Sequence, residues 1–89
     1  MPTVDINGHE VEYDQEVAES WDVADLLVTI DDEAPVSQYA KLANMFQIVE
    51  MCTGLDKPHF IELCGGGRVK RDEMAQHLGK TIAQLVSKN

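Results

Sequence analysis

Residues 35–54 constrain the fold more than any other stretch, because apolar side chains are dense along their whole length. The apolar positions are Val36, Tyr39, Ala40, Leu42, Ala43, Met45, Phe46, Ile48, Val49, Met51 and Cys52. Pro35 is typical of the first turn of a helix, and Gly54 of a helix end. A surface helix needs one apolar stripe about 100° wide, whereas this helix is apolar over more than half of its circumference. We therefore expect either the central helix of the domain or a helix with one face in the core and another for a partner.

A β-hairpin is predicted over residues 3–13. Asn7-Gly8 is a preferred pair for a two-residue type I′ turn, in which both residues need a positive φ. Apolar residues alternate with polar ones on both sides of this turn, at Val4, Ile6, Val11 and Tyr13. An isolated hairpin is marginally stable in water, so its apolar face must pack on the helices that follow.

Four helices are expected, at about 16–31, 36–53, 57–64 and 70–87. They predict an α+β fold that is mostly α, with the N-terminal β-hairpin packed on a bundle of three to four helices in a single domain, 1–89. Asp56 and Pro58 mark the start of the third helix, and Gly65-Gly66-Gly67 its end. Gly79 costs the last helix stability and suggests a close approach to another helix.

The helix predicted at 16–31 leaves two questions open. Asp14 and Ser20 are both suitable N-caps, so the helix can begin near either residue. Its apolar face is expected to contain Val17, Trp21, Ala24, Leu27 and Val28. Trp21 is then the core residue beneath the hairpin, and the alternative is an exposed Trp21 that anchors a protein interface.

The charge of −9 is unevenly distributed along the 89 residues. Residues 1–34 hold eleven acidic residues and no Lys or Arg, whereas residues 35–89 hold five acidic residues and all seven basic ones. Such an acidic segment repels nucleic acid and anionic membranes, and is either a solvated face or a docking surface for a basic partner. We find neither a membrane-spanning run nor a signal peptide, and expect a cytoplasmic protein with reduced Cys52 and Cys64.

No residue pattern identifies a catalytic, metal or cofactor site. Gly65-Gly66-Gly67-Arg68 lacks the remaining residues of a phosphate-binding loop and is interpreted as a helix connector. Cys52, His59 and Cys64 have no common zinc spacing, and the cysteines are expected in the core. We therefore expect a non-enzyme without a cofactor, and the candidate partner-binding residues are Trp21, Tyr39, Phe46 and Met51.

The order of these features is more informative than any one of them. A hairpin leads to a helix start at Ser20-Trp21-Asp22-Val23-Ala24-Asp25-Leu26-Leu27, and an acidic break precedes the apolar segment from Leu42 to Met51. A short helix then ends in Gly65-Gly66-Gly67-Arg68-Val69, before a final amphipathic helix. This order resembles the small tail assembly chaperones of long-tailed phages and prophages, particularly those of Gram-positive hosts, over nearly the whole chain.

The resemblance implies a role without catalysis in the host cytoplasm. Such chaperones bind the long, aggregation-prone tape measure protein, help the tail tube protein to assemble around it, and often exist in a longer, frameshifted form. Self-association is also expected, because surplus apolar surface is often buried between copies of a small domain. The alternative function is a small acidic adaptor or inhibitor that docks on a basic protein surface, which predicts binding that weakens steeply with salt.

Overall fold

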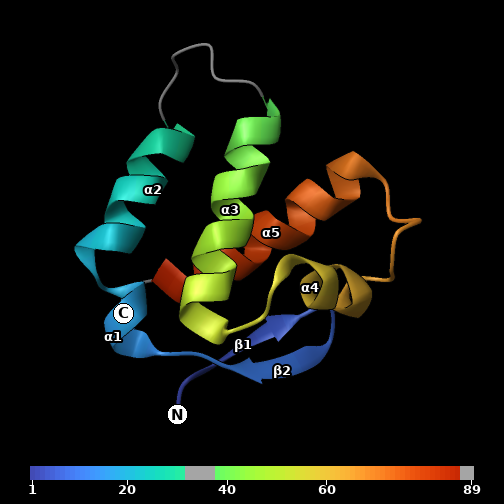
Figure 1. Cartoon of the computed structure of the whole chain (residues 1–89). Coiled ribbons are helices and arrows are strands. Elements are labelled where there is room, and N and C mark those ends of the chain that lie inside the picture. Colours follow the sequence, from blue (N-terminus) through green and yellow to red (C-terminus); the bar gives the residue numbers. More distant parts are fainter. Residues whose placement is uncertain (32–37, 87–89) are drawn as a thin grey trace.

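A two-stranded antiparallel hairpin begins the chain, and helices follow it (Figure 1). The computed structural model describes residues 1–31 and 38–86. Its elements are β1 (Thr3–Ile6), β2 (His9–Glu12), α1 (Gln15–Ala18), α2 (Trp21–Asp31), α3 (Gln38–Thr53), α4 (Lys57–Leu63) and α5 (Arg71–Val86). The predicted class, an α+β fold that is mostly α with an N-terminal hairpin, is confirmed.

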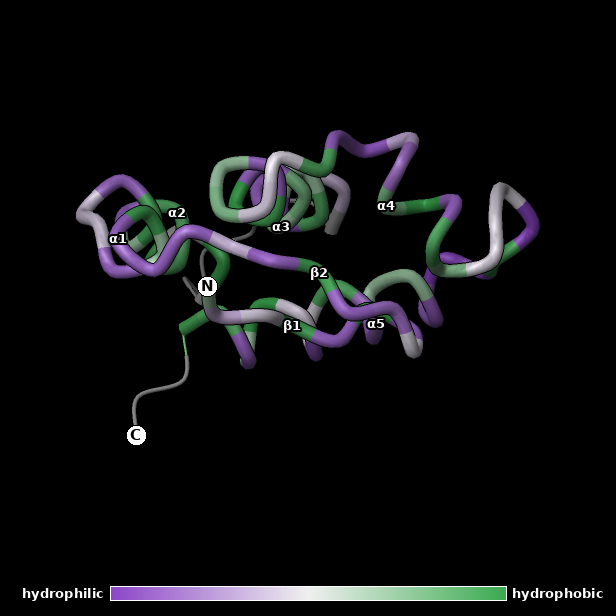
Figure 2. Tube along the Cα trace, turned by 90° about the horizontal axis from the view of Figure 1, so that it is seen from below, coloured by the Kyte–Doolittle hydropathy of each residue, from purple (hydrophilic) through white to green (hydrophobic). Residues whose placement is uncertain are grey.

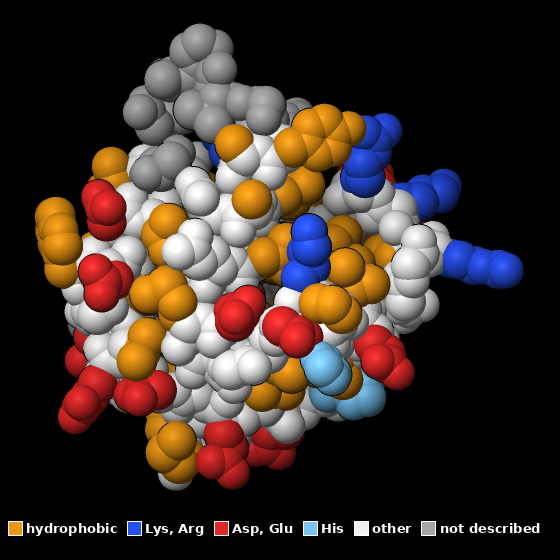
Figure 3. Space-filling model, viewed as in Figure 1, with side chains coloured by type: hydrophobic (Ala, Val, Ile, Leu, Met, Phe, Trp, Pro, Cys, Tyr) orange, Lys and Arg blue, Asp and Glu red, His pale blue; other side chains and the backbone are white. Residues whose placement is uncertain are grey.

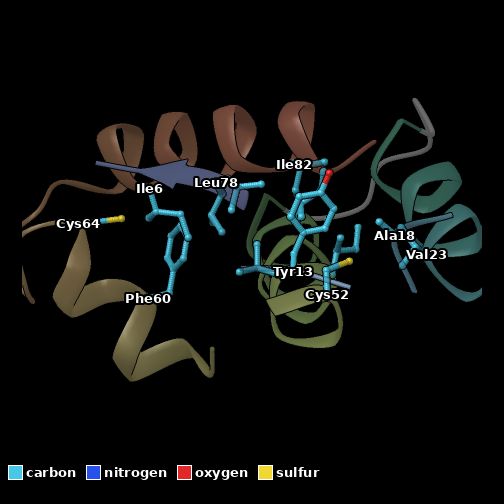
Figure 4. Packing of buried hydrophobic residues seen from close by; sticks show 13 residues of the cluster. Ile6, Tyr13, Ala18, Val23, Cys52, Phe60, Cys64, Leu78 and Ile82 are labelled. Atoms are coloured by element: carbon cyan, nitrogen blue, oxygen red, sulfur yellow. The ribbon is translucent and has the colours of Figure 1, made fainter. Parts of the chain in front are cut away.

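The elements form two layers in a molecule of 36 × 33 × 21 Å (Figure 2). Helix α5 lies beside β1 in one layer, and α2, α3 and α4 lie in the other. Buried side chains from both layers fill the space between them, as Figure 4 shows for Ile6, Leu78 and Ile82 opposite Phe60 and Cys52. Helix α3 contacts α1, α2 and α5, and is therefore the central helix.

The hairpin has the predicted turn. Asn7 and Gly8 have φ angles of 51° and 87°, and Ile6 pairs with His9 across the two-residue loop. Asn7 has a second role, because its Nδ2 donates a hydrogen bond of 3.0 Å to the Leu63 carbonyl at the end of α4. The turn is thereby attached to the helical layer.

Helix α5 completes the outer edge of the hairpin through one side chain. The Gln84 Nε2 donates to the Asp5 carbonyl, and the Asp5 N–H donates to the Gln84 Oε1, both at 2.8 Å. A strand edge exposes unpaired backbone groups, and here a side-chain amide takes the place of a further strand. This contact fixes the position of β1 on α5.

The single helix predicted at 16–31 is wrong, because both candidate caps are used. Asp14 Oδ1 accepts the N–H of Glu16 at 2.9 Å and begins α1, and Ser20 Oγ accepts the N–H of Val23 at 3.4 Å and begins α2. The break between the two helices changes which side of α2 faces the core. The side chains that α2 turns inward are Val23, Leu26, Leu27 and Ile30.

The predicted core position of Trp21 is therefore also wrong. The Trp21 side chain is 77% exposed and that of Val28 is 65% exposed. Both lie on the side of α2 opposite Val23, which is fully buried. The spacing that groups Trp21 with Val17 assumes one continuous helix. Because the helix breaks between these two residues, Trp21 does not share the buried side of Val17.

The other helix ends follow the predicted signals. The Gly54 N–H donates to the Glu50 carbonyl at 2.8 Å with a φ of +78°, and Asp56 caps α4. At the far end of α4, the Gly66 N–H bonds to the Ile61 carbonyl at 2.9 Å in a Schellman arrangement. Pro35, residues 36–37 of the predicted second helix and residue 87 of the last lie outside the described residues.

Gly65 and Gly79 differ in their surroundings. A Cβ atom at Gly79 would meet nothing within 4 Å, so the predicted close approach to another helix is wrong. At Gly65, φ is +121° and a Cβ atom would lie 3.1 Å from the Val69 Cγ2. Of these two positions, only Gly65 requires glycine.

We expect Gly79→Ala to raise the free energy of unfolding by about 0.5–1 kcal/mol, because alanine restricts the unfolded chain and meets open space in α5. Gly65→Ala should lower it by about 1–3 kcal/mol, because the backbone there is left-handed. Urea unfolding followed by circular dichroism measures both. Destabilisation by Gly79→Ala would contradict the open surroundings of this position.

Gln84→Ala should lower the free energy of unfolding by about 1 kcal/mol, because it removes both hydrogen bonds to Asp5. It should also speed exchange of the Asp5 amide proton, measured by NMR. Gln76→Ala, an exposed glutamine of the same helix, is the control and should change stability by less than about 0.5 kcal/mol. Equal effects of the two substitutions would show that the β1 edge does not depend on Gln84.

Candidate protein-binding surfaces

Helix α3 is buried unevenly along its length. Its buried side chains among the described residues are Ile48, Val49 and Cys52, all in its C-terminal half. Tyr39, in the first turn, is 62% exposed. Figure 1 shows that this end of α3 runs beside α2, away from the hairpin. The N-terminal half of α3 is apolar but lies at the margin of the core.

A groove of about 960 Å³ lies between this half of α3 and the start of α5. We call it the α3–α5 groove, and it is lined by Tyr39, Lys41, Leu42, Met45, Val69, Lys70, Arg71, Asp72 and Ala75. Its lining comes from two segments that are distant in sequence, residues 39–45 and 69–75. A concave apolar surface with polar groups at its margin is the usual form of a binding site.

The charged residues of the groove are mainly basic. Lys41, Lys70 and Arg71 contribute three positive charges, against one negative charge from Asp72. The Arg71 Nη1 donates a hydrogen bond to the Tyr39 hydroxyl, and the guanidinium carbon lies 5.9 Å from the centroid of that ring. This contact holds Tyr39 at the groove margin although its ring is largely exposed. Figure 3 shows most of its basic side chains gathered at the upper right, whereas acidic side chains are spread over the left, the bottom and the centre of this face.

A second depression, of about 480 Å³, lies around Phe46. We call it the Phe46 hollow, and it is lined by Ala43, Phe46, Gln47, Glu50, Met51 and Lys57. The Phe46 ring packs edge-to-face on buried Phe60, with 5.7 Å between centroids and 89° between planes. The Nζ atom of Lys57, at the start of α4, lies 5.7 Å from the centroid of the Phe46 ring. Phe46 thus has one side in the core and one toward the hollow.

Three of the four predicted partner-binding residues lie on α3, with Tyr39 and Phe46 on one side and Met51 at the other edge of the Phe46 hollow. Tyr39 and Phe46 are seven residues apart and lie on the same side of α3, with exposed Ala43 between them. Met51 joins Phe46 in the hollow. We call Tyr39, Ala43, Phe46 and Met51 the outer face of α3. Trp21 is not part of it, because it lies on α2.

Trp21 belongs to a different exposed surface. Trp21 and Val28 are also seven residues apart, so they lie on one side of α2. Two acidic residues, Asp22 and Asp25, lie beside them and are exposed. We call Trp21, Asp22, Asp25 and Val28 the α2 stripe. It combines apolar side chains with negative charge.

The cysteines and histidines do not form a reactive cluster in the described residues. Cys52 and Cys64 are free, and burial raises the pKa of each thiol, with a further rise at Cys52 from the negative charge of Asp14. A raised pKa opposes formation of the nucleophilic thiolate. None of the three depressions described by the structure is lined by His59, Cys64 or Arg68, and no metal-binding group of three or more His, Cys, Asp or Glu occurs in residues 1–31 and 38–86.

His59 instead has a local structural role. Its ring Nδ1 bonds to the Asp56 carboxylate, which also accepts the His59 N–H at 3.1 Å as the N-cap of α4. The side-chain hydrogen bond raises the pKa of His59 and lowers the pKa of Asp56. The His59 side chain is largely exposed and that of Asp56 is half-exposed, so solvent and salt weaken the pair.

A comparison with known protein families, with curated proteins and with solved structures finds no match for this chain. In the part of the chain that the structure describes, no helix combines the length and apolar character needed to cross a bilayer.

Sequence reasoning did not assign Val28, Lys41, Lys70 or Arg71 to a surface with a role. The helical periodicity places Val28 on the apolar face with Trp21, and it gives no role to the basic residues near position 70. The spacing of Arg68, Lys70 and Arg71 was a visible signal of local positive charge. The contribution of Lys41 had no such signal, because only tertiary packing brings it to the same groove.

We expect Asp56→Asn to lower the pKa of His59 toward its ordinary value, because the carboxylate that stabilises the imidazolium is lost. NMR titration of the His59 ring measures this change. Asparagine remains a good N-cap, so α4 should still form. An unchanged His59 midpoint would contradict the pairing.

The same pair predicts how stability depends on pH. The stabilisation from His59 is complete below its unfolded pKa and is lost as pH rises above about 6.5, through the raised folded pKa. The stabilisation from Asp56 is present above its unfolded pKa and is lost as pH falls below about 4, through the lowered folded pKa. In the Asp56→Asn variant, the free energy of unfolding should change less with pH in both ranges. Urea unfolding at a series of pH values measures this change.

Proposed function

We propose that this protein is a non-enzymatic tail assembly chaperone that binds the tape measure protein of a long-tailed phage or prophage and aids assembly of the tail tube. The observation that carries the proposal is the outer face of α3, where Tyr39 is exposed and Phe46 and Met51 are half-buried beside a hollow. The order of sequence features that resembles this family supports the same conclusion. The binding site is then the outer face of α3.

The shape of this face suits a helical client. Tyr39 and Phe46 are separated by two helical turns, about 10 Å along α3. An amphipathic helix presents apolar side chains at the same spacing, so it can cover both positions when it lies along α3. A long, apolar helical protein that would otherwise aggregate offers such stripes repeatedly.

The charge of the chain supports a solubilising role. The described acidic residues before α3 lie on the hairpin, α1 and α2, and none of them lines the Phe46 hollow. A client on the outer face of α3 would therefore leave much of this negative charge in water. Net charge of one sign keeps a complex dispersed through repulsion between particles.

Ala43→Arg tests the proposal without disturbing the core, because Ala43 is exposed at the centre of the outer face. The arginine would obstruct a client helix and should raise the dissociation constant for the tape measure protein of the same locus roughly tenfold or more. The matched control is Ala83→Arg, an exposed alanine on α5. Binding is measured by co-expression and pulldown, with the short chain and with any frameshifted longer form.

The proposal fails if the wild-type protein captures no tape measure protein in either form. It also fails if Ala43→Arg binds as well as Ala83→Arg, since a client would then lie elsewhere. Circular dichroism and thermal unfolding establish that both variants fold.

The segregation of charge favours a second candidate function, an acidic adaptor or inhibitor that docks on a basic protein surface. Binding of that kind would use the acidic residues of α2, and would weaken strongly as salt is raised because exposed ion pairs are screened. Binding of an apolar helix on α3 would change much less. A salt titration of client binding separates the two functions.

A further inference from the structure

The α2 stripe and the α3–α5 groove have complementary properties. The groove has an apolar lining from Leu42, Met45 and Ala75, with basic residues at its margin. The stripe offers two exposed apolar side chains with acidic residues beside them. We propose that copies of this chain associate head to tail, with the α2 stripe of one copy in the α3–α5 groove of the next.

The apolar part of the interface is inferred from the size and exposure of the Trp21 and Val28 side chains. A tryptophan that is 77% exposed keeps most of its large apolar surface in water, and Val28 adds to this surface two turns further along α2. Tryptophan is enriched among residues that dominate binding energy when it enters a pocket. The groove, at about 960 Å³, has room for an indole ring and a valine side chain.

The charged part determines which partner fits. Lys41, Lys70 and Arg71 surround a groove in a protein of net charge −9, so an approaching acidic helix meets locally favourable charge there. Asp22 and Asp25 supply the opposite charge on the stripe. A membrane surface is a poorer partner for the stripe, because helices that lie on anionic lipid carry Lys and Arg on their polar side.

The arrangement of the helices determines the type of assembly. Helix α3 lies between α2 and the start of α5, so the stripe and the groove are on different sides of the molecule (Figure 1). An interface between two different patches is heterologous, and it forms a ring if its rotation closes and an open chain of copies if it does not. The Phe46 hollow shares no lining residue with the groove and remains open, whereas Tyr39 lines the groove and would be covered by the neighbouring copy.

Two complementary double variants test the head-to-tail arrangement. Trp21→Ser with Val28→Ser removes the stripe and keeps the groove, whereas Lys70→Glu with Arg71→Glu reverses the groove charge and keeps the stripe. Sedimentation velocity of the wild-type protein, from about 1 to about 300 μM, should show species that grow with concentration. Each variant alone should remain a monomer, with a dissociation constant raised roughly tenfold or more.

A mixture of the two variants gives the decisive result. Only one stripe and one groove remain intact, so the mixture should form a heterodimer and nothing larger. Lys80→Glu, a charge reversal at an exposed position of α5 outside the groove, should associate like the wild type. A wild-type protein that stays monomeric, a variant that still associates alone, or a mixture without heterodimer would each overturn the proposal. Circular dichroism confirms the fold of each variant, and client binding through α3 is measured separately.

Discussion

The burial of the C-terminal half of α3 is the constraint on which the rest of the structure depends. Ile48, Val49 and Cys52 belong to one cluster with side chains from β1, α4 and α5. The Cys52 carbonyl also accepts the Asp14 N–H at 2.8 Å, so the end of α3 fixes the point where the chain leaves the hairpin. A chain of 89 residues can build only one small core, and this one is centred on two turns of one helix.

The incomplete burial of the N-terminal half of α3 follows from that concentration of the core. Helix α5 begins at Arg71 with Asp72 and Glu73 in its first turn, which are polar residues that cannot close over Tyr39 and Leu42. The adjoining segment contributes Val69 alone to the apolar lining of the groove. The apolar excess of α3 therefore lines a groove and a hollow, and concave apolar surfaces are the usual form of binding sites.

Local rules were sufficient for the features that depend on local geometry. The turn at Asn7-Gly8, the cap at Asp56 and the helix end at Gly54 are each determined by the φ or hydrogen-bonding needs of a few adjacent residues, and each was predictable. The buried side of α2 was not, because Asp14 and Ser20 were equally good caps and periodicity does not reveal that both are used. The mistaken placement of Trp21 follows from this one ambiguity. The outer face of α3 was predictable as a surplus of apolar residues, but the groove needed the packing of α5 against α3.

The charge asymmetry of the sequence acquires a different meaning once the chain is folded. Eleven acidic residues precede residue 35, which by itself suggests a docking surface for a different protein with a basic surface. The fold places three of the basic residues around a groove on the same molecule, so a basic partner surface exists on every other copy. The Phe46 hollow is different, because Glu50 and Lys57 contribute one charge of each sign. Salt should therefore act mainly on contacts at the stripe and the groove, and little on contacts at the hollow, which distinguishes self-association from client binding at Phe46.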